Sequence, residues 1–151
     1  MTLVINCSPR HYNLGAAKLA NWLRSQGDIV EEWNGAPGLF ALGHTQIYLS
    51  VIFSWDALLA RDIALYMKDK GDVACGGPGM FALQSWWKKE TGLTCCSALD
   101  SRFERQQGRY HMTFASRGCP VNCYFCIVPR LEHKHNEYSK KWICCRRQHI
   151  C

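Results

Sequence analysis

The feature that most constrains the fold of this chain is an apolar run at residues 47–53, Ile-Tyr-Leu-Ser-Val-Ile-Phe. A run of this length is typical of a single strand, and it is apolar nearly throughout. Strands with this composition occur in parallel sheets whose two faces are both covered by helices. The run therefore predicts a layered α/β fold.

Short apolar runs and helical patterns alternate along residues 1–100, as in a sheet with crossover helices. We expect strands at residues 3–5, 28–30, 47–53, 72–75 and 93–99. Helical spacing predicts three intervening helices, and the second has Ser54 or Asp56 as its cap and Leu59, Ile63, Tyr66 and Met67 as its buried stripe. The expected domain at 1–100 is an open, mostly parallel sheet with flanking helices, Rossmann/flavodoxin-like.

The net charge of +6 is concentrated at one end of the chain. Residues 1–100 hold eight Lys and Arg against nine Asp and Glu, whereas residues 101–151 hold ten against three. A basic last third can contact phosphate or nucleic acid, or it can be a solvated tail. No apolar run of about 18 residues predicts a membrane helix, and no basic stretch precedes the first apolar run as in a signal peptide.

Ten cysteines indicate either a disulfide framework or metal chemistry. Their distribution does not suit disulfides, because Cys7 and Cys75 are solitary and two further pairs are adjacent residues, 95–96 and 144–145. With no secretory signal expected, we predict a reducing, cytoplasmic location. The close set is Cys119, Cys123 and Cys126.

This close set has the spacing Cys-x₃-Cys-x₂-Cys, within Arg-Gly-Cys119-Pro-Val-Asn-Cys123-Tyr-Phe-Cys126-Ile-Val-Pro. Thiolates are the usual ligands of iron–sulfur clusters, but ferredoxin loops and paired zinc knuckles use other spacings. Three thiolates on a four-iron cluster leave one iron open. An open iron can bind a substrate or cofactor and pass it an electron.

With Gly118 before the first cysteine and Phe125 before the last, the loop resembles the CxxxCxΦC motif of the radical S-adenosylmethionine (SAM) superfamily. The resemblance implies that Cys119, Cys123 and Cys126 hold a [4Fe-4S] cluster, that SAM chelates its fourth iron, and that Phe125 packs against the adenine of SAM. An external electron donor such as flavodoxin or ferredoxin would reduce the cluster. The reduced cluster would cleave SAM to a 5′-deoxyadenosyl radical that attacks a substrate, which the sequence does not identify.

Three segments of the first hundred residues resemble the cobalamin-binding-like domain that precedes many radical SAM barrels: 13–15, 49–54 and 73–78. The resemblance implies Ser50, Gly76 and Gly77 as candidate cobalamin contacts. The Asp-x-His-x-x-Gly motif that supplies a cobalt ligand is absent. The alternatives that remain open are bound cobalamin, a domain that keeps only the fold, and a domain that docks the substrate.

Three other interpretations remain open. The methylthiotransferase branch of the superfamily shares Ile127-Val128-Pro129, and its second cluster could use Cys7 and Cys75, although the middle cysteine is missing. A small zinc-binding module could contact nucleic acid through its basic end. Its fourth ligand would come from His133, His135 or Cys144. The third interpretation is a flavodoxin-like domain with an inert appendage, in which Cys75, Cys95 and Cys96 pack as small hydrophobic residues.

The expected organisation after residue 100 is a linker at 101–109 and the first strand and cluster loop of an incomplete radical SAM barrel at 110–132, with the strand at 110–115. Fewer residues follow Cys126 than the roughly 30 of one βαβ unit. We expect a truncated or frame-shifted reading frame, an irregular basic tail at 133–151 that is not native to the fold, and little turnover by this polypeptide. Alternatively, Cys144, Cys145 and Cys151 ligate an auxiliary cluster.

Overall fold

The computed structural model of the chain describes residues 1–36, 43–96, 116–117, 121, 123–124 and 136–137. The chain divides into two compact units, Met1–Met112 and Thr113–Cys151, which are described separately. None of the helices in the described ranges is both long enough and apolar enough to cross a membrane.

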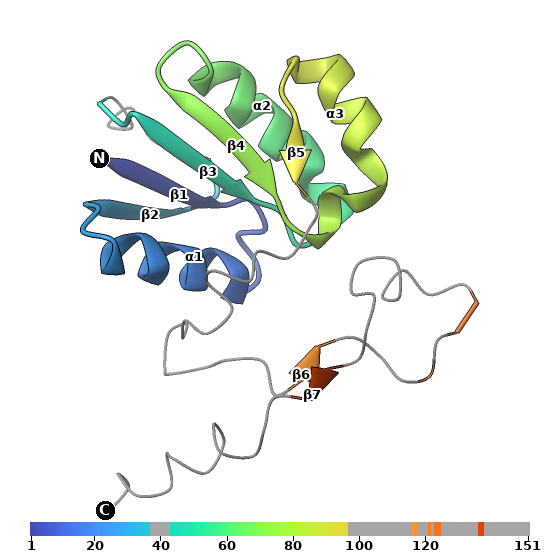
Figure 1. The fold of residues 1–151 in the computed structure, drawn as a ribbon. Helices are drawn as coiled ribbons and strands as arrows, with labels where there is room; N and C mark the ends of the chain where they lie inside the picture. The colour runs from blue at the N-terminus through green and yellow to red at the C-terminus, as the bar shows by residue number, and fades with distance from the viewer. Residues whose placement is uncertain (37–42, 97–115, 118–120, 122, 125–135, 138–151) are drawn as a thin grey trace, which may run out of the picture. The chain divides into compact units, whose positions relative to one another are not determined.

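The first unit is an α/β layer built on a parallel sheet with the strand order β2-β1-β3-β4-β5 (Figure 1). The strands are β1 (Thr2–Asn6), β2 (Val30–Asn34), β3 (Gln46–Ser50), β4 (Asp72–Gly76) and the two-residue β5 (Cys95–Cys96). The helices are α1 (Leu14–Ser25), α2 (Ala57–Met67) and α3 (Gln84–Thr91), with 3₁₀ turns η1 (Ser54–Asp56) and η2 (Pro78–Leu83). The predicted parallel α/β domain is confirmed, and the strand order is that of flavodoxin-like sheets.

The two faces of the sheet carry separate hydrophobic clusters. Alternate residues of a strand point to opposite faces, so Leu3 and Ile5 pack with α2 and α3. Val4, between them, packs with Ala20 and Leu23 of α1. Figure 1 shows α1 on one face of the sheet and α2 and α3 on the other. The central strands are therefore covered on both sides, as their apolar composition predicts.

Strands β1 and β4 match the predicted ranges to within one residue at each end, whereas the boundaries of β2, β3 and β5 differ by more. Strand β2 begins at Val30 instead of residue 28, and Ile29 is 72% exposed ahead of it. Strand β3 ends at Ser50, although the apolar run continues to residue 53. The apolar composition extends past the strand because Val51 is fully buried there. The backbone N–H of Val51 donates to the Gly76 carbonyl at 2.9 Å. Strand β5 spans only residues 95–96 of the predicted 93–99, of which 97–99 lie outside the described residues.

The buried face of α2 contains more small residues than predicted. Ile63 and Met67 are buried and Leu59 is partly buried, as expected, but Ala57, Ala60 and Ala64 supply the rest of the face. The prediction for Tyr66 was wrong, because its ring is about half exposed and lies 3.0 Å from Lys70 Nζ. Asp56 stands at the N-cap position without a side-chain capping bond, so the capping prediction is also wrong.

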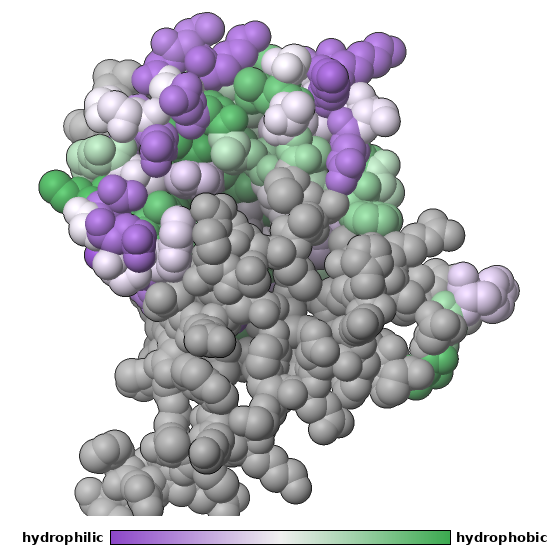
Figure 2. All heavy atoms as spheres, in the orientation of Figure 1, coloured by the Kyte–Doolittle hydropathy of each residue, from purple (hydrophilic) through white to green (hydrophobic). Residues whose placement is uncertain are grey.

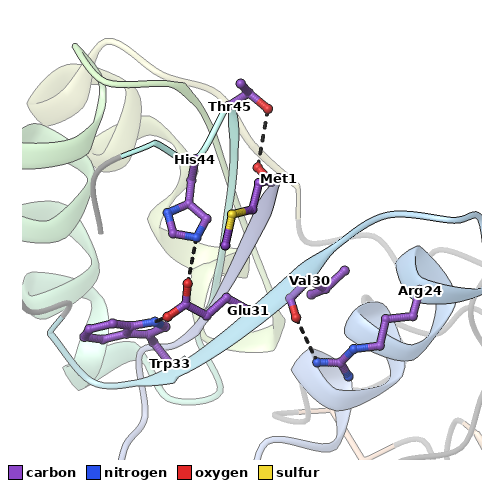
Figure 3. Close-up of polar contacts among 7 residues, drawn as sticks. All are labelled: Met1, Arg24, Val30, Glu31, Trp33, His44 and Thr45. Carbon is purple, nitrogen blue, oxygen red and sulfur yellow. Dashed lines mark hydrogen bonds and ion pairs between the residues drawn. The ribbon is translucent and has the colours of Figure 1, made fainter. Parts of the chain in front are cut away.

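Figure 3 shows a carboxylate that ties β2 to His44, in the segment that leads into β3. The buried His44 ring places Nε2 at 2.9 Å from Glu31 Oε2, and Trp33 Nε1 donates to the other oxygen of the same carboxylate. On the opposite side of β2, Arg24 of α1 donates to the Val30 carbonyl at 3.1 Å. These bonds tie the edge strand to the segment that leads into β3 and to α1.

Hydrophilic side chains gather along the top of the first unit in Figure 2, where Figure 1 places the loop between α2 and β4. Lys68, Asp69 and Lys70 of that loop are exposed. Lys68 and Lys70 follow the last residue of α2, where cations interact favourably with the C-terminal end of the helix dipole.

In the second unit, β6 (Ser116–Arg117) pairs antiparallel with β7 (Asn136–Glu137). The predicted strand at 110–115 and the linker at 101–109 lie outside the described residues. Strand β7 falls within the segment expected to be an irregular tail, so the residues 136–137 depart from that expectation.

The loop after β4 packs directly on the backbone that leaves β3. Gly77 has φ +113°, and a Cβ at this position would lie 2.3 Å from the Val51 carbonyl oxygen. Gly79 also approaches a backbone closely. A Cβ at Gly79 would lie 2.7 Å from the carbonyl carbon of Phe53. Glycine is therefore required at Gly77 for both its backbone angle and the space it leaves.

We predict that Gly77→Ala lowers the free energy of unfolding by about 3 kcal/mol, because the methyl group adds a backbone clash to the cost of a positive φ. Gly27→Ala is the matched control. Gly27 has φ +93° with nothing within 4 Å of its would-be Cβ, so it should cost about 1 kcal/mol. Urea unfolding of both variants measures the difference, and equal losses would contradict the close approach at Val51.

Candidate functional site

The carboxyl edge of the sheet holds the loops that follow β1, β2, β3 and β4. In open parallel sheets, ligands bind beyond this edge, at the point where the strand order reverses. Here β1 connects through α1 to β2 on one side, while β3 pairs with β1 on the other. The reversal point therefore lies between the loops at residues 7–13 and 51–56.

The buried side chain of Asn13 links these two strands at the reversal point. Its Nδ2 donates to Ser50 Oγ at 2.9 Å and to Asn6 Oδ1 at 3.1 Å. Its Oδ1 accepts from the backbone N–H of Ala16 at 3.0 Å and so caps α1. One amide thus joins β1, β3 and the start of α1.

The Asn6 side chain fixes the loop that follows β1. It donates to the His11 carbonyl at 2.9 Å and to Asn34 Oδ1 at 2.7 Å, and it accepts from the Ser8 backbone N–H at 2.9 Å. Asn34 in turn donates to the Pro9 carbonyl at 3.1 Å. The loop is therefore held by side-chain amides from two strands.

The predicted cobalamin contacts Ser50, Gly76 and Gly77 do come together at this edge. Ser50 and Gly76 are register partners on adjacent strands, and Gly77 follows directly. Two of them have hydrogen-bond partners within the protein. Ser50 Oγ accepts from Asn13 Nδ2, and the Gly76 carbonyl accepts from the Val51 N–H. The space beside Gly77 is filled by the Val51 backbone. Cobalamin binding stays a prediction.

A cleft of about 650 Å³ opens beside this network. Its lining comes from β1, β2, α1 and the loop that follows β1: Val4, Asn6, Pro9, Arg10, His11, Tyr12, Asn13, Ala16, Ala17, Asn21, Glu32, Trp33 and Asn34. Two of these side chains carry a formal charge, and Glu32 is paired with Arg24 at 2.7 Å. Within the described part of the chain, Arg10 is exposed and its guanidinium has no hydrogen-bond partner. The cleft therefore presents one uncompensated cation.

Three aromatic rings extend from the cleft across the reversal point. The ring of His11, in the cleft, contacts Phe53 edge-on with centroids 4.8 Å apart. Phe53 stacks on Trp55 at 4.5 Å and 7°, and Trp55 is 68% exposed. Sequence reasoning missed this stack, although Phe53 and Trp55 flank a serine directly after a buried strand.

Cys7, Cys75 and Cys95 lie on the α2–α3 side of the sheet. Cys7 and Cys75 are buried and Cys95 is partly buried, in the hydrophobic cluster of that face. Burial raises the pKa of Cys7 to about 12, with the charge of Asp56 as a second cause, and burial also raises the pKa of Cys75. Among the described residues, no group of three or more His, Cys, Asp or Glu could hold a metal ion. Cys75 and Cys95 pack as small hydrophobic residues, as predicted, while the Cys96 side chain lies outside the described set.

Part of the predicted cluster loop is described. Cys123 is an unbridged, partly exposed cysteine, and the neighbouring Tyr124 is 95% exposed. Cys119, Phe125 and Cys126 lie outside the described residues, as do His133, His135, Cys144, Cys145 and Cys151. Comparisons with protein-family models, curated proteins and solved structures find no match to the chain.

We predict that Asn13→Ala lowers the free energy of unfolding by about 3 kcal/mol, because it removes the α1 cap and the buried bonds to Ser50 and Asn6. Asn13→Ser keeps a capping oxygen and loses the bridge, so it should cost about 2 kcal/mol. Denaturant unfolding of both variants is the measurement. An Asn13→Ser protein as stable as the parent would contradict the bridging role.

The raised pKa of Cys7 predicts that stability falls as the pH rises above about 9. From the ordinary value of 9.0 up to about 12, the folded thiol stays protonated while the unfolded thiol ionises. The unfolded state then binds fewer protons, so this thiol alone lowers the free energy of unfolding by about 1.4 kcal/mol per pH unit. Below pH 9 it has no effect.

The measurement is urea unfolding from about pH 8 to about pH 10.5 under reducing conditions, for the parent and for Cys7→Ala. The parent should lose stability more steeply, by about 1 kcal/mol per pH unit. Parallel profiles would show that Cys7 ionises normally in the folded protein.

Proposed function

We propose that this chain is a radical SAM protein that binds a [4Fe-4S] cluster through Cys119, Cys123 and Cys126 and takes SAM at the remaining iron. The observation that carries the proposal is the Cys-x₃-Cys-x₂-Cys spacing, with Phe125 before the last cysteine. The substrate remains outside the proposal.

The chemistry of the donor set fits an iron–sulfur cluster. Thiolates are the ligands that such clusters use, and a cysteine that binds iron must be accessible and able to ionise. Cys123 is unbridged and partly exposed, in contrast to the buried Cys7 and Cys75. When reduced by an external donor such as flavodoxin or ferredoxin, a bound cluster supplies the electron that cleaves SAM.

The α/β unit supports the proposal as a domain that can precede the cluster loop. Its Ser50 hydroxyl already accepts from Asn13, and Val51 fills the space beside Gly77. These contacts favour the alternative in which the domain keeps the fold without cobalamin. Cys7 and Cys75 pack in the hydrophobic cluster of the sheet, and the middle cysteine of the methylthiotransferase set is missing, which disfavours the methylthiotransferase-like second cluster.

The test is anaerobic reconstitution of the full chain with iron and sulfide, followed by reduction and electron paramagnetic resonance. We expect a reducible four-iron signal that changes when SAM is added. Cys123→Ala should abolish the signal, because it removes one of three ligands. Cys95→Ala is the matched control and should leave it, since Cys95 packs against the hydrophobic cluster of the sheet.

Two results would contradict the proposal. Stoichiometric zinc with no iron signal would favour the small zinc-binding module that contacts nucleic acid. A cluster signal that persists in Cys123→Ala would assign the iron to other cysteines. Cyanocobalamin added to the same protein tests the cobalamin alternative, which predicts retention of the corrinoid on gel filtration.

A further inference from the structure

We propose that the carboxyl edge of the α/β unit binds a nucleotide, with its phosphates at Arg10 and its base stacked on Trp55. This inference concerns the first unit alone and goes beyond the proposed SAM chemistry. It uses none of the cluster cysteines.

The cleft beside the reversal point has the size and position of a small-molecule site. Its volume of about 650 Å³ falls within the roughly 300–1,000 Å³ typical of such sites. It lies at the carboxyl ends of β1 and β2, where open parallel sheets bind their ligands. The cleft can therefore hold the phosphate end of a nucleotide, while Trp55, which would stack on the base, lies outside the cleft lining.

Arg10 supplies the charge for an anionic group. It lines the cleft, is exposed, and has no hydrogen-bond partner in the described part of the chain. The carboxylate of Glu32 does not neutralise it, because Arg24 holds that group at 2.7 Å. A guanidinium binds phosphate through paired N–H donors, which makes phosphate the anion that this position suits.

Trp55 supplies a surface for a planar ring. Its indole is 68% exposed, although a tryptophan gains stability from burial, and it is held flat against Phe53 at 4.5 Å. Phe53 contacts His11, the residue that follows Arg10 in the cleft. The cleft and the aromatic surface are therefore joined through two successive ring-to-ring contacts, His11 with Phe53 and Phe53 with Trp55. A ligand that uses both carries a phosphate and a planar base.

Three side-chain amides of the cleft are already bonded within the protein, and the base on Trp55 lies outside the cleft lining. Asn6, Asn13 and Asn34 direct their side chains to other protein groups at 2.7 to 3.2 Å. Recognition then depends on Arg10 and on ring stacking, and stacking tolerates any base. We expect purine and pyrimidine nucleotides to bind with similar affinity.

The test is isothermal titration of the full, iron-free chain with ADP, adenosine and pyrophosphate as separate probes. ADP should bind more tightly than either part. Trp55→Ala should weaken ADP and adenosine about tenfold and leave pyrophosphate unchanged. Arg10→Ala should weaken ADP and pyrophosphate about tenfold and leave adenosine unchanged.

Matched controls are Tyr66→Ala and Lys88→Ala, which remove an exposed aromatic residue and an exposed cation from α2 and α3. Both should bind ADP as the parent does, as should Cys123→Ala, so that failure of the cluster and failure of this site are distinguishable. Circular dichroism checks that each variant is folded. No heat with millimolar ADP, or ADP binding that both Arg10→Ala and Trp55→Ala leave intact, would overturn the inference.

Discussion

The two central strands, β1 and β3, have to be covered by helices on both faces, and the rest of the first unit depends on this requirement. Their residues are buried on both sides, with Leu3, Ile5, Ile47 and Leu49 toward α2 and α3 and Val4 toward α1. Since parallel strands need crossover connections, covering both faces sends α1 one way and α2 the other. The loops after β1 and β3 then separate, which creates the edge where polar and aromatic side chains gather.

Two close contacts hold that edge in shape. Asn13 joins the ends of β1 and β3 to the start of α1, and Gly77 lets the loop after β4 rest on the Val51 backbone. Both contacts are internal to the protein, so residues whose pattern suggested ligand contacts are explained first by packing. Among the described residues of this edge, Arg10 and Trp55 are exposed groups that this packing leaves accessible to a ligand.

The sequence predicted the fold well because apolar patterning reports burial directly. It predicted the five strands and three helices described in the first unit, but it misplaced boundaries where burial continues beyond hydrogen bonding, as at Val51. It misassigned Tyr66 because an aromatic residue at helical spacing resembles a core residue, while alanines do the close packing of α2.

The candidate site was only partly predictable. Ser50, Gly76 and Gly77 were placed at the correct edge, since residues that follow parallel strands meet there. The bridge from Asn13 to Ser50 joins residues 37 positions apart, and the edge-on contact of His11 with Phe53 also joins separate loops. Such pairings depend on strand order, which periodicity does not specify. The spacing of the cluster cysteines, by contrast, is local and can be read from the sequence alone.

The central claim is that three thiolates hold an iron–sulfur cluster with one iron left for SAM. The most direct measurement is Mössbauer spectroscopy of the chain reconstituted with ⁵⁷Fe, recorded without and with SAM. The account predicts that one iron of the [4Fe-4S] cluster changes its parameters on SAM addition while the other three keep theirs. Four irons that all stay unchanged, or a protein that takes up no iron, would contradict it.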